Sequence, residues 1–346
     1  ILKGTITSDV TLAAGNTYKL SGEYIVEEGA TLHIEEGVKI IAVYDDIADY
    51  ILVKQGGKIN AVGTPDKPIV MTSEKEEPGA WGGIHICGRA HTNAEGGKGS
   101  SEIGGAVYGG NDDADNSGTL QYIRLEYTGF AFDEEHEANG ISFYGVGNGT
   151  IVDHCQAYKG SDDGFEFFGG SVNVSNLVAV SCSDDSFDWT EGWNGKGTNL
   201  VAYQEAESTL GYDCDCLMEC DNNGSNNAAT PVAHPVLKNL ILVGNGGSKQ
   251  GIRLRAGTEV EIDNAKVCGK GQPLTVETAL TENALKNGTS KLTNITLTSE
   301  LSCKEGIYTH ADFIAVTSNK VDANLSYSSF EDIKKECSWM NGNWVK

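Results

Sequence analysis

The chain has 346 residues, and it is rich in glycine (44) and poor in proline (6). Its formal net charge of −24 argues against nucleic-acid binding, because nucleic acids are bound by basic surfaces. No apolar run approaches the ~20 residues that a membrane-spanning helix needs, so we expect no membrane-spanning segment.

The first residue is Ile1 rather than Met, which is typical of a mature product whose export signal has been removed. Together with the acidity, this start predicts a soluble protein that is secreted or displayed at the cell surface.

Short apolar segments separated by turns fill residues 5–72, which we interpret as the first, narrower coils of a longer structure. The expected strands are Thr31–Ile34, Gly37–Ile40, Ile51–Val53, Lys58–Ala61 and Ile69–Met71. Two long excursions rich in small and polar residues follow, at about 88–118 and about 205–236. Long loops on a solenoid usually form the walls of its binding face.

Two short phrases recur through most of the chain. One is a glycine or serine followed by apolar–polar–apolar, at Gly83–Ile86, Gly140–Phe143, Gly164–Phe167, Ser186–Trp189 and Gly251–Leu254. The other begins at asparagine, at Asn176–Ala179, Asn199–Ala202, Asn239–Leu242, Asn264–Val267 and Asn294–Leu297. Tyr122–Leu125 and His154–Ala157 fall in the same column as the second phrase. Steps of 22 residues (154 to 176) and 23 residues (176 to 199) are too short for a βαβ unit but suit one turn of a strand solenoid.

The repeat therefore predicts an all-β fold, a single-stranded right-handed parallel β-helix over residues 1–329. Asparagine at one column is typical of stacked coils that form side-chain amide ladders at their turns. Residues 330–346 are expected to form a C-terminal capping segment. Its large apolar side chains would plug the open end of the core: Phe330, Trp339, Met340 and Trp344.

The first phrase also predicts a column of charged side chains on the outside of the solenoid. Alternate residues of a strand point to opposite faces, so Glu166, Asp188, Glu219 and Arg253 point outward from successive coils. Coils lie about 4.8 Å apart, and two carboxylates at that distance repel by roughly 3 kcal/mol at an effective dielectric constant near 20. Such a stack is relieved by binding a cation, by sharing a proton or by pairing with Arg253.

The turns that lead into these strands add paired aspartates at matched positions. Asp162 and Asp163 lie 22 residues before Asp184 and Asp185. One interpretation is that these residues cap turns by accepting hydrogen bonds from backbone amides. The alternative is a calcium site, because carboxylate oxygens are the ligands that Ca²⁺ prefers. Its expected ligands are Asp163, Glu166, Asp185, Asp188 and Glu219.

The same column permits a catalytic interpretation. Glycosidases use two carboxylates that are about 5 Å apart for retention or about 6.5–9.5 Å apart for inversion, and stacked coils supply both separations. A lyase would instead need calcium and a basic group, for which Arg253 or Arg255 is the candidate. Aromatic side chains beside the patch would favour carbohydrate, since sugars stack on rings. The candidates are Tyr144, Trp193 and Tyr212, although each of them is also explained by packing in a turn.

Nine cysteines leave at least one thiol unpaired. Cys155 takes an inward position, where a small buried thiol is expected. Cys214, Cys216 and Cys220 have no partner motif for zinc, so a loop disulfide that includes Cys182 is favoured over a metal site. A second disulfide between Cys303 and Cys337 is expected near the C-terminal cap.

Six runs of the chain have a distinctive composition: Trp81–Ile84, Tyr108–Asp112, Asp115–Gly118, Gly145–Thr150, Asp162–Ser171 and Asp184–Asp188. With these runs, about Gly4–Asn245 resembles a family of exported, pectin-lyase-like β-helix proteins of Gram-negative bacteria, often lipoproteins or surface-sorted. The resemblance implies a solenoid that is exported to the outer-membrane surface, the outside of the cell or the periplasm, and it allows a lipid anchor upstream of Ile1. It implies no activity, since none is assigned to the family. A looser similarity to polygalacturonases rests on Asp184–Asp185 and Arg253–Arg255, but no Gly-His-Gly follows and Arg255 replaces their lysine.

From these observations we expect an exported β-helix that binds a polysaccharide, a cell-surface glycan or an extracellular protein through its acidic face, with calcium and without catalysis. The alternative is a glycoside hydrolase or polysaccharide lyase that uses Glu166, Asp188, Glu219 and Arg253. Release of reducing or unsaturated ends from polysaccharides would distinguish the two.

Overall fold

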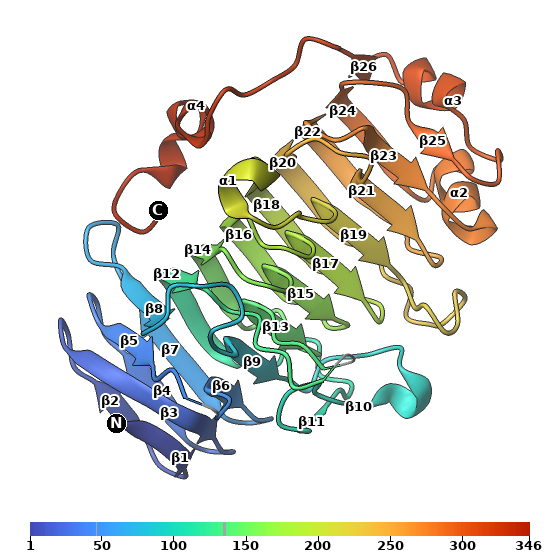
Figure 1. Cartoon of the computed structure of the whole chain (residues 1–346). Helices are drawn as coiled ribbons and strands as arrows, with labels where there is room; N and C mark the ends of the chain where they lie inside the picture. The colour runs from blue at the N-terminus through green and yellow to red at the C-terminus, as the bar shows by residue number, and fades with distance from the viewer. Residues whose placement is uncertain (46, 134–135) are drawn as a thin grey trace.

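The computed structural model describes residues 1–45, 47–133 and 136–346, and in them 24 strands join one continuous parallel sheet that winds into a solenoid (Figure 1). The prediction of a right-handed parallel β-helix is confirmed. Each coil places its strands in three stacks, which we call A, B and C. The chain passes from A through B to C and then enters A of the next coil.

Stack A carries the first phrase. It is built from β6 (Tyr50–Val53), β9 (Ile84–Cys87), β13 (Ile141–Tyr144), β15 (Phe165–Phe168), β17 (Phe187–Thr190), β19 (Met218–Asp221), β21 (Gln250–Arg255), β23 (Gln272–Val276) and β25 (Ser302–Cys303). Stack B begins with β2 (Val10–Leu12), β4 (Thr31–Ile34) and β7 (Lys58–Val62), and stack C contains β5 (Lys39–Ala42), β8 (Ile69–Ser73) and, at its far end, β26 (Lys320–Val321).

Longer strands bend and serve two stacks each. Their first halves belong to stack B and their second halves to stack C in β12 (Gly118–Glu126), β14 (Ile151–Tyr158), β16 (Asn173–Val180), β18 (Lys196–Tyr203), β20 (Val236–Val243), β22 (Glu261–Cys268) and β24 (Lys291–Leu297). Near the N-terminus, β3 (Thr17–Val26) joins stack C to stack A, and β1 (Leu2–Ile6) pairs with both of its halves.

The bend between stacks B and C is the asparagine column of the second phrase. Its asparagines have φ between 56° and 65°, a left-handed conformation that asparagine tolerates better than most residues. Their amides form the predicted ladder: Asn199 donates to Asn176 (2.8 Å), Asn239 to Asn199 (3.0 Å) and Asn264 to Asn239 (2.9 Å). At the two ends, Asn176 and Asn294 donate to the carboxylates of Asp153 and Asp263. The ladder therefore fixes both the bend and the register of successive coils.

Replacing Asn199 by alanine is expected to lower the free energy of unfolding by about 2–3 kcal/mol. The variant loses two ladder hydrogen bonds and also puts alanine in the left-handed region, which asparagine tolerates better because its short polar side chain can hydrogen-bond locally. Asn199→Gly loses the same hydrogen bonds without that strain, so it should cost less. Denaturant titration of both variants tests this order, and equal losses would contradict the strain argument.

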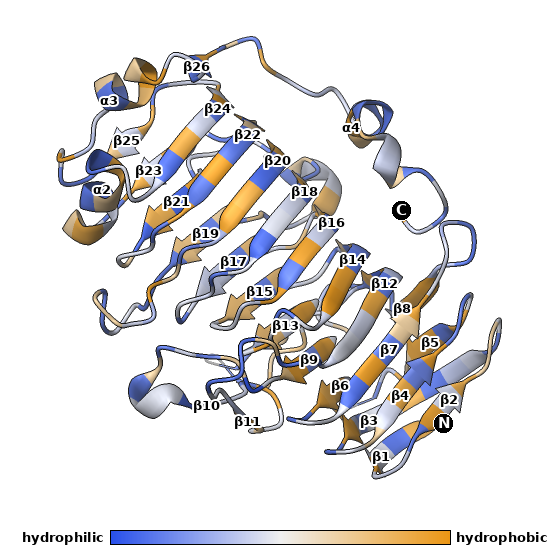
Figure 2. Ribbon diagram, turned by 180° about the vertical axis from the view of Figure 1, so that it is seen from behind, coloured by the Kyte–Doolittle hydropathy of each residue, from blue (hydrophilic) through white to orange (hydrophobic). Residues whose placement is uncertain are grey.

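The core is a continuous stack of apolar rings and aliphatic side chains that point inward from all three stacks. Phe143 stacks on Phe167 with ring centroids 5.0 Å apart, and Phe165 stacks on Phe187 at 5.6 Å. The glycines that open the first phrase allow neighbouring coils to approach closely. A Cβ on Gly164, for example, would lie 2.6 Å from the backbone oxygen of Ser186. Hydrophobic and hydrophilic bands alternate along the strands accordingly (Figure 2).

The first excursion lies between β9 and β12 and contains η1 (Glu95–Gly97) and the antiparallel hairpin of β10 (Gly99–Ser100) with β11 (Val107–Tyr108). It packs on stack A, where the ring centroids of Tyr108 and Tyr144 are 5.1 Å apart and the Tyr108 hydroxyl donates a hydrogen bond to the Glu191 carboxylate. The second excursion is not a single loop. Strand β19 runs through it in stack A, so two loops flank this strand, and the first of them carries α1 (Glu207–Leu210).

The C-terminal end of the core is covered by α2 (Ala279–Lys286), α3 (His310–Ala315) and the residues between them. Leu285, Leu301, Tyr308 and Phe313 belong to the same buried cluster as the core of the solenoid. The prediction that residues 330–346 plug this opening is therefore wrong, because the place is already taken by apolar side chains from α2, α3 and their connection.

Residues 330–346, which we call the strap, instead run back along the outside of stack C (Figure 1). The strap contains α4 (Phe330–Glu336) and η2 (Ser338–Met340). Its buried residues pack on outward-facing side chains of stack C, which include Val178, Val201 and Ile241. Its end reaches the early coils, where the backbone N–H of Asn343 donates to the backbone oxygen of Pro65 at 2.7 Å. None of the helices in the described residues has the length and hydropathy needed to cross a bilayer.

Candidate functional site

The predicted charged column exists on the outer face of stack A. Parallel pairing sets Glu166 opposite Asp188, Asp188 opposite Glu219 and Glu219 opposite Arg253. The residues on either side of each acid are buried in the core, as alternation in a strand requires. The three acids themselves are half-buried. We call this row, from Glu166 to Arg253, the acid column.

The turn aspartates join the column at its entrance. Asp163 Oδ1 accepts a hydrogen bond from the Asp185 amide (2.8 Å), and Asp185 Oδ1 accepts one from the Cys216 amide (2.7 Å). Each of these carboxylates therefore caps the turn of the next coil, as one of the two interpretations proposed. Their second oxygens remain available to the column. Asp162 is buried and Asp184 half-buried in the same turns.

The five carboxylates expected to bind calcium lie close together. Asp163, Glu166 and Asp188 each offer an oxygen within 4.8 Å of the others, and Asp185, Asp188 and Glu219 do the same. Asp188 belongs to both groups and is the centre of the cluster. Asp162, Asp163 and Asp184 form a third group of this kind at the turns. The structure thus brings the predicted ligands into two sets that share one side chain.

Burial and mutual repulsion make these carboxylates hard to ionise. Burial is the larger cause and neighbouring negative charges the second, and together they raise the pKa of Asp163, Glu166, Asp185 and Asp188 well above the usual carboxyl range. The same causes raise the pKa of Asp162 to about 8, with Asp184 as the charge that contributes most. A proton or a cation is needed to neutralise the cluster.

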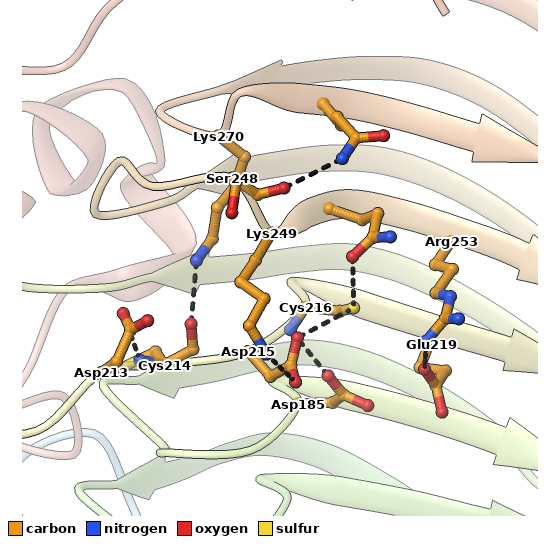
Figure 3. Close-up of polar contacts among 12 residues, drawn as sticks. Asp185, Asp213, Cys214, Asp215, Cys216, Glu219, Ser248, Lys249, Arg253 and Lys270 are labelled. Carbon is orange, nitrogen blue, oxygen red and sulfur yellow. Dashed lines mark hydrogen bonds and ion pairs between the residues drawn. The ribbon is translucent and has the colours of Figure 1, made fainter. Parts of the chain in front are cut away.

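Two arginines compensate the far end of the column. Arg253 donates to Glu219 at 2.9 Å and to Glu277 at 3.0 Å, while Arg255 donates to Asp221 at 2.7 Å (Figure 3 shows Arg253 and Glu219). Burial opposes the charge of Arg253, but the hydrogen bond with Glu277 and the charge of Glu219 raise its pKa above the usual value. Arg253 is therefore held as a cation between two carboxylates, which does not suit the role of proton acceptor.

The sequence analysis missed two residues that act on the opposite end of the column. Asn139 is fully buried, and its amide donates to Glu166 Oε2 at 2.6 Å and to Ser142 Oγ at 3.0 Å. Its Oδ1 is buried without a hydrogen-bond partner among the described residues. Glu102, from the first excursion, is the neighbouring charge that contributes most to raising the pKa of Glu166, and burial raises the pKa of Glu102 itself to about 7. Asn139 could have been found from the sequence, because it directly precedes the copy of the first phrase that begins at Gly140. No sequence pattern marked Glu102.

The aromatic residues expected beside the patch do not lie on its surface, which corrects that prediction for two of them. Tyr144 is buried and stacks on Phe168 at 4.4 Å. Trp193 is buried and stacks on Phe167 at 4.1 Å, and its Nε1 donates to the Val172 oxygen. Tyr212 is half-buried and donates to the Ser181 oxygen, so its hydroxyl is committed to a turn. Turn and core packing, the alternative interpretation, accounts for all three.

The nine cysteines are all free thiols, so both expected disulfides are wrong. Cys155 is buried in the core, as expected. Cys214, Cys216 and Cys220 are also buried, and Cys216 Sγ lies 3.5 Å from Asp215 Oδ1. Lys249 pairs with Asp215 at 2.7 Å beside Asp185, which places one cation at the edge of the cluster (Figure 3).

The comparison with protein families agrees with the geometry. The family described as a pectate-lyase-like β-helix domain matches residues 4–346. This chain belongs to that family. Membership agrees with the parallel β-helix of the structure, and the acid column of this member lies on stack A. Neither the curated proteins nor the solved structures contain a match to the chain.

Proposed function

We propose that this pectate-lyase-like β-helix is an exported protein that binds calcium in the acid column and, through it, a polysaccharide, a cell-surface glycan or an extracellular protein, without catalysis. The proposal rests on one observation above all. Two sets of carboxylates share Asp188 and lie at the outer face of stack A, and within each set the carboxylate oxygens are within 4.8 Å of one another.

The orphan oxygen of Asn139 supports a cation rather than a proton alone. An amide oxygen and carboxylates are hard acceptors of the kind that Ca²⁺ collects, and six to eight of them complete its shell. Asn139 already donates to Glu166, which keeps its own oxygen near the column. A bound calcium ion with free coordination positions would bind oxygen atoms of an acidic ligand. This fits a protein that is itself too acidic to attract anions directly.

Calcium is expected to raise the melting temperature, and the chelator EDTA to lower it. At a calcium concentration 100 times the dissociation constant, the stabilisation is about 2.7 kcal/mol. Asp188→Asn should abolish this response because Asp188 serves both sets, and it should raise the melting temperature of the ion-free protein by removing a repelling charge. Glu300→Gln, which removes an exposed carboxylate elsewhere, is the matched control. A melt that calcium does not move would refute the calcium proposal.

The second candidate is a polysaccharide hydrolase or lyase that acts at the same column. The observation that favours it is the short separation of Asp163, Glu166 and Asp188, which includes the roughly 5 Å spacing of retaining glycosidases. A carboxyl with a raised pKa could also serve as the acid. Release of reducing or unsaturated ends by the wild type, lost in Glu166→Gln, would establish this activity and overturn the binding proposal.

The proposed location is outside the cytoplasm, at the cell surface or in the periplasm. The acidity of the chain and its membership of this β-helix family support it. Fractionation of cells that express the full gene product, with and without globomycin to block lipoprotein maturation, tests both export and a lipid anchor.

A further inference from the structure

A cleft of about 390 Å³ lies far from the acid column, between the B–C bend of the solenoid and the strap. Its floor is formed by β18, β20 and β22, and its outer wall by the end of α4 and the start of η2. The residues that matter for its chemistry are Asn199, Asn239, Asn264, Lys266, Ser338 and Trp339. This volume is within the range of sites for small organic ligands.

The floor is a regular row of amides. Each side-chain amide nitrogen in the row has two N–H groups and donates one of them in the ladder, at Asn199, Asn239 and Asn264. Asn264 is exposed, and its oxygen accepts no ladder bond because Asn294 donates to Asp263 instead. Successive amides are one coil apart, about 4.8 Å, which is close to the length of one pyranose residue in an extended chain. The row therefore offers donors and an acceptor at the repeat of a saccharide.

The outer wall holds an aromatic ring in place. Trp339 is half-buried and packs against Trp344 with centroids 6.2 Å apart and against His154 at 6.5 Å. Glu336 accepts from both Lys266 and Tyr327, which ties α4 to β22 and fixes the position of the wall. The Lys266–Glu336 pair also leaves these two side chains with no net charge.

We propose that this cleft binds a neutral oligosaccharide, with a sugar ring against Trp339 and hydroxyl groups on the asparagine row. Sugar rings present apolar C–H faces that pack on aromatic rings, while their hydroxyls exchange hydrogen bonds with planar amides. A neutral ligand fits the paired charges of the wall and the net charge of −24, which repels anionic ligands. The site is separate from the acid column and does not depend on calcium.

The test is a binding titration of the full chain with cellohexaose, xylohexaose, mannohexaose and maltohexaose in the presence of EDTA, by calorimetry and by tryptophan fluorescence. We expect one or more of them to bind, and Trp339→Ala to weaken the affinity about tenfold or more. Ser338→Trp should block the cleft from an exposed position that the fold tolerates. Asp188→Asn should bind as the wild type does.

The outcomes separate this proposal from the one for the acid column. Loss of binding in both Trp339→Ala and Ser338→Trp, with melting temperatures near that of the wild type, supports the cleft. Binding that persists in Ser338→Trp, binding that is lost in Asp188→Asn, or no binding of any of the four hexasaccharides overturns it. Neither result bears on whether calcium raises the melting temperature.

Discussion

Replacing Trp193 by alanine is expected to lower the free energy of unfolding by about 3–5 kcal/mol, among the largest effects of a single substitution in this chain. The ring is buried, stacks on Phe167 and lies 5.7 Å from Trp189, so its removal opens a cavity in the core beneath stack A. The Val172 oxygen also loses its hydrogen bond from Nε1. Denaturant unfolding followed by far-ultraviolet circular dichroism measures the loss.

Trp193→Phe is the matched control, because it keeps an aromatic ring in the stack while giving up Nε1 and part of the volume. It should cost less than half as much as alanine. A Trp193→Ala variant that keeps wild-type stability but no longer binds glycan would show instead that the ring acts at a surface, as the sequence first suggested.

The melting temperature of the ion-free protein is expected to fall by roughly 5–10 °C between pH 5 and pH 8. Asp162, with a pKa of about 8, and Glu102, with a pKa of about 7, hold protons more tightly in the folded state than in the unfolded chain. Asp163, Glu166 and Asp188 are shifted in the same direction. Unfolded carboxyls titrate near pH 4, so the folded state binds more protons over the interval from about pH 4 to about pH 8.

The sign of the pH dependence follows from this difference in bound protons. The contribution of a carboxyl with a raised pKa is fully present below its unfolded pKa and is lost as pH rises through its folded pKa. Asp153 has the opposite behaviour. Despite its burial, hydrogen bonds from His154 and Asn176 lower its pKa to about 2, so its contribution is lost only as pH falls below about 4. The optimum of the ion-free protein should therefore lie near pH 4–5.

Calcium provides the sharpest check of this linkage. It replaces the protons of the column, so it should restore the melting temperature at pH 8 and change it little at pH 5. Scanning calorimetry of EDTA-treated protein at both pH values, with and without calcium, measures all four states. The double variant Glu166→Gln with Asp188→Asn should flatten the pH dependence. A melting temperature that rises from pH 5 to pH 8 without calcium would mean that the column is not protonated.

The repeat in the sequence was sufficient to predict the winding of the chain. One turn of about 22 residues, alternation within each phrase and asparagine at a fixed column are local properties, and together they fix the coil, the inward side chains and the ladder. Parallel pairing places equivalent positions of successive coils next to one another. The order of Glu166, Asp188, Glu219 and Arg253 therefore followed from the same periodicity.

Features that break the repeat could not be predicted in this way. Trp193 and Tyr144 were both expected at the surface. Trp193 lies in a turn, where strand alternation does not set the direction of a side chain, and its ring fills the core. Tyr144 points outward at the end of β13, as alternation requires, but the first excursion covers its ring. The position of residues 330–346 could not be predicted either: they were expected to close the C-terminal end of the core, but they form the strap on the outside of stack C. Apolar residues in 330–346 signal burial but do not say against what, and α2 with α3 had already closed the end.

The sequence by itself determined the solenoid, the phase of its strands and the row of acids on one outer face, since these depend on residues at fixed spacing along the chain. Only the tertiary structure decided how deeply those acids are buried, that Asn139 contacts Glu166 and Glu102 raises its pKa, and that the strap encloses a cleft with Trp339. These outcomes depend on contacts between segments far apart in sequence, and no local pattern carries such distances.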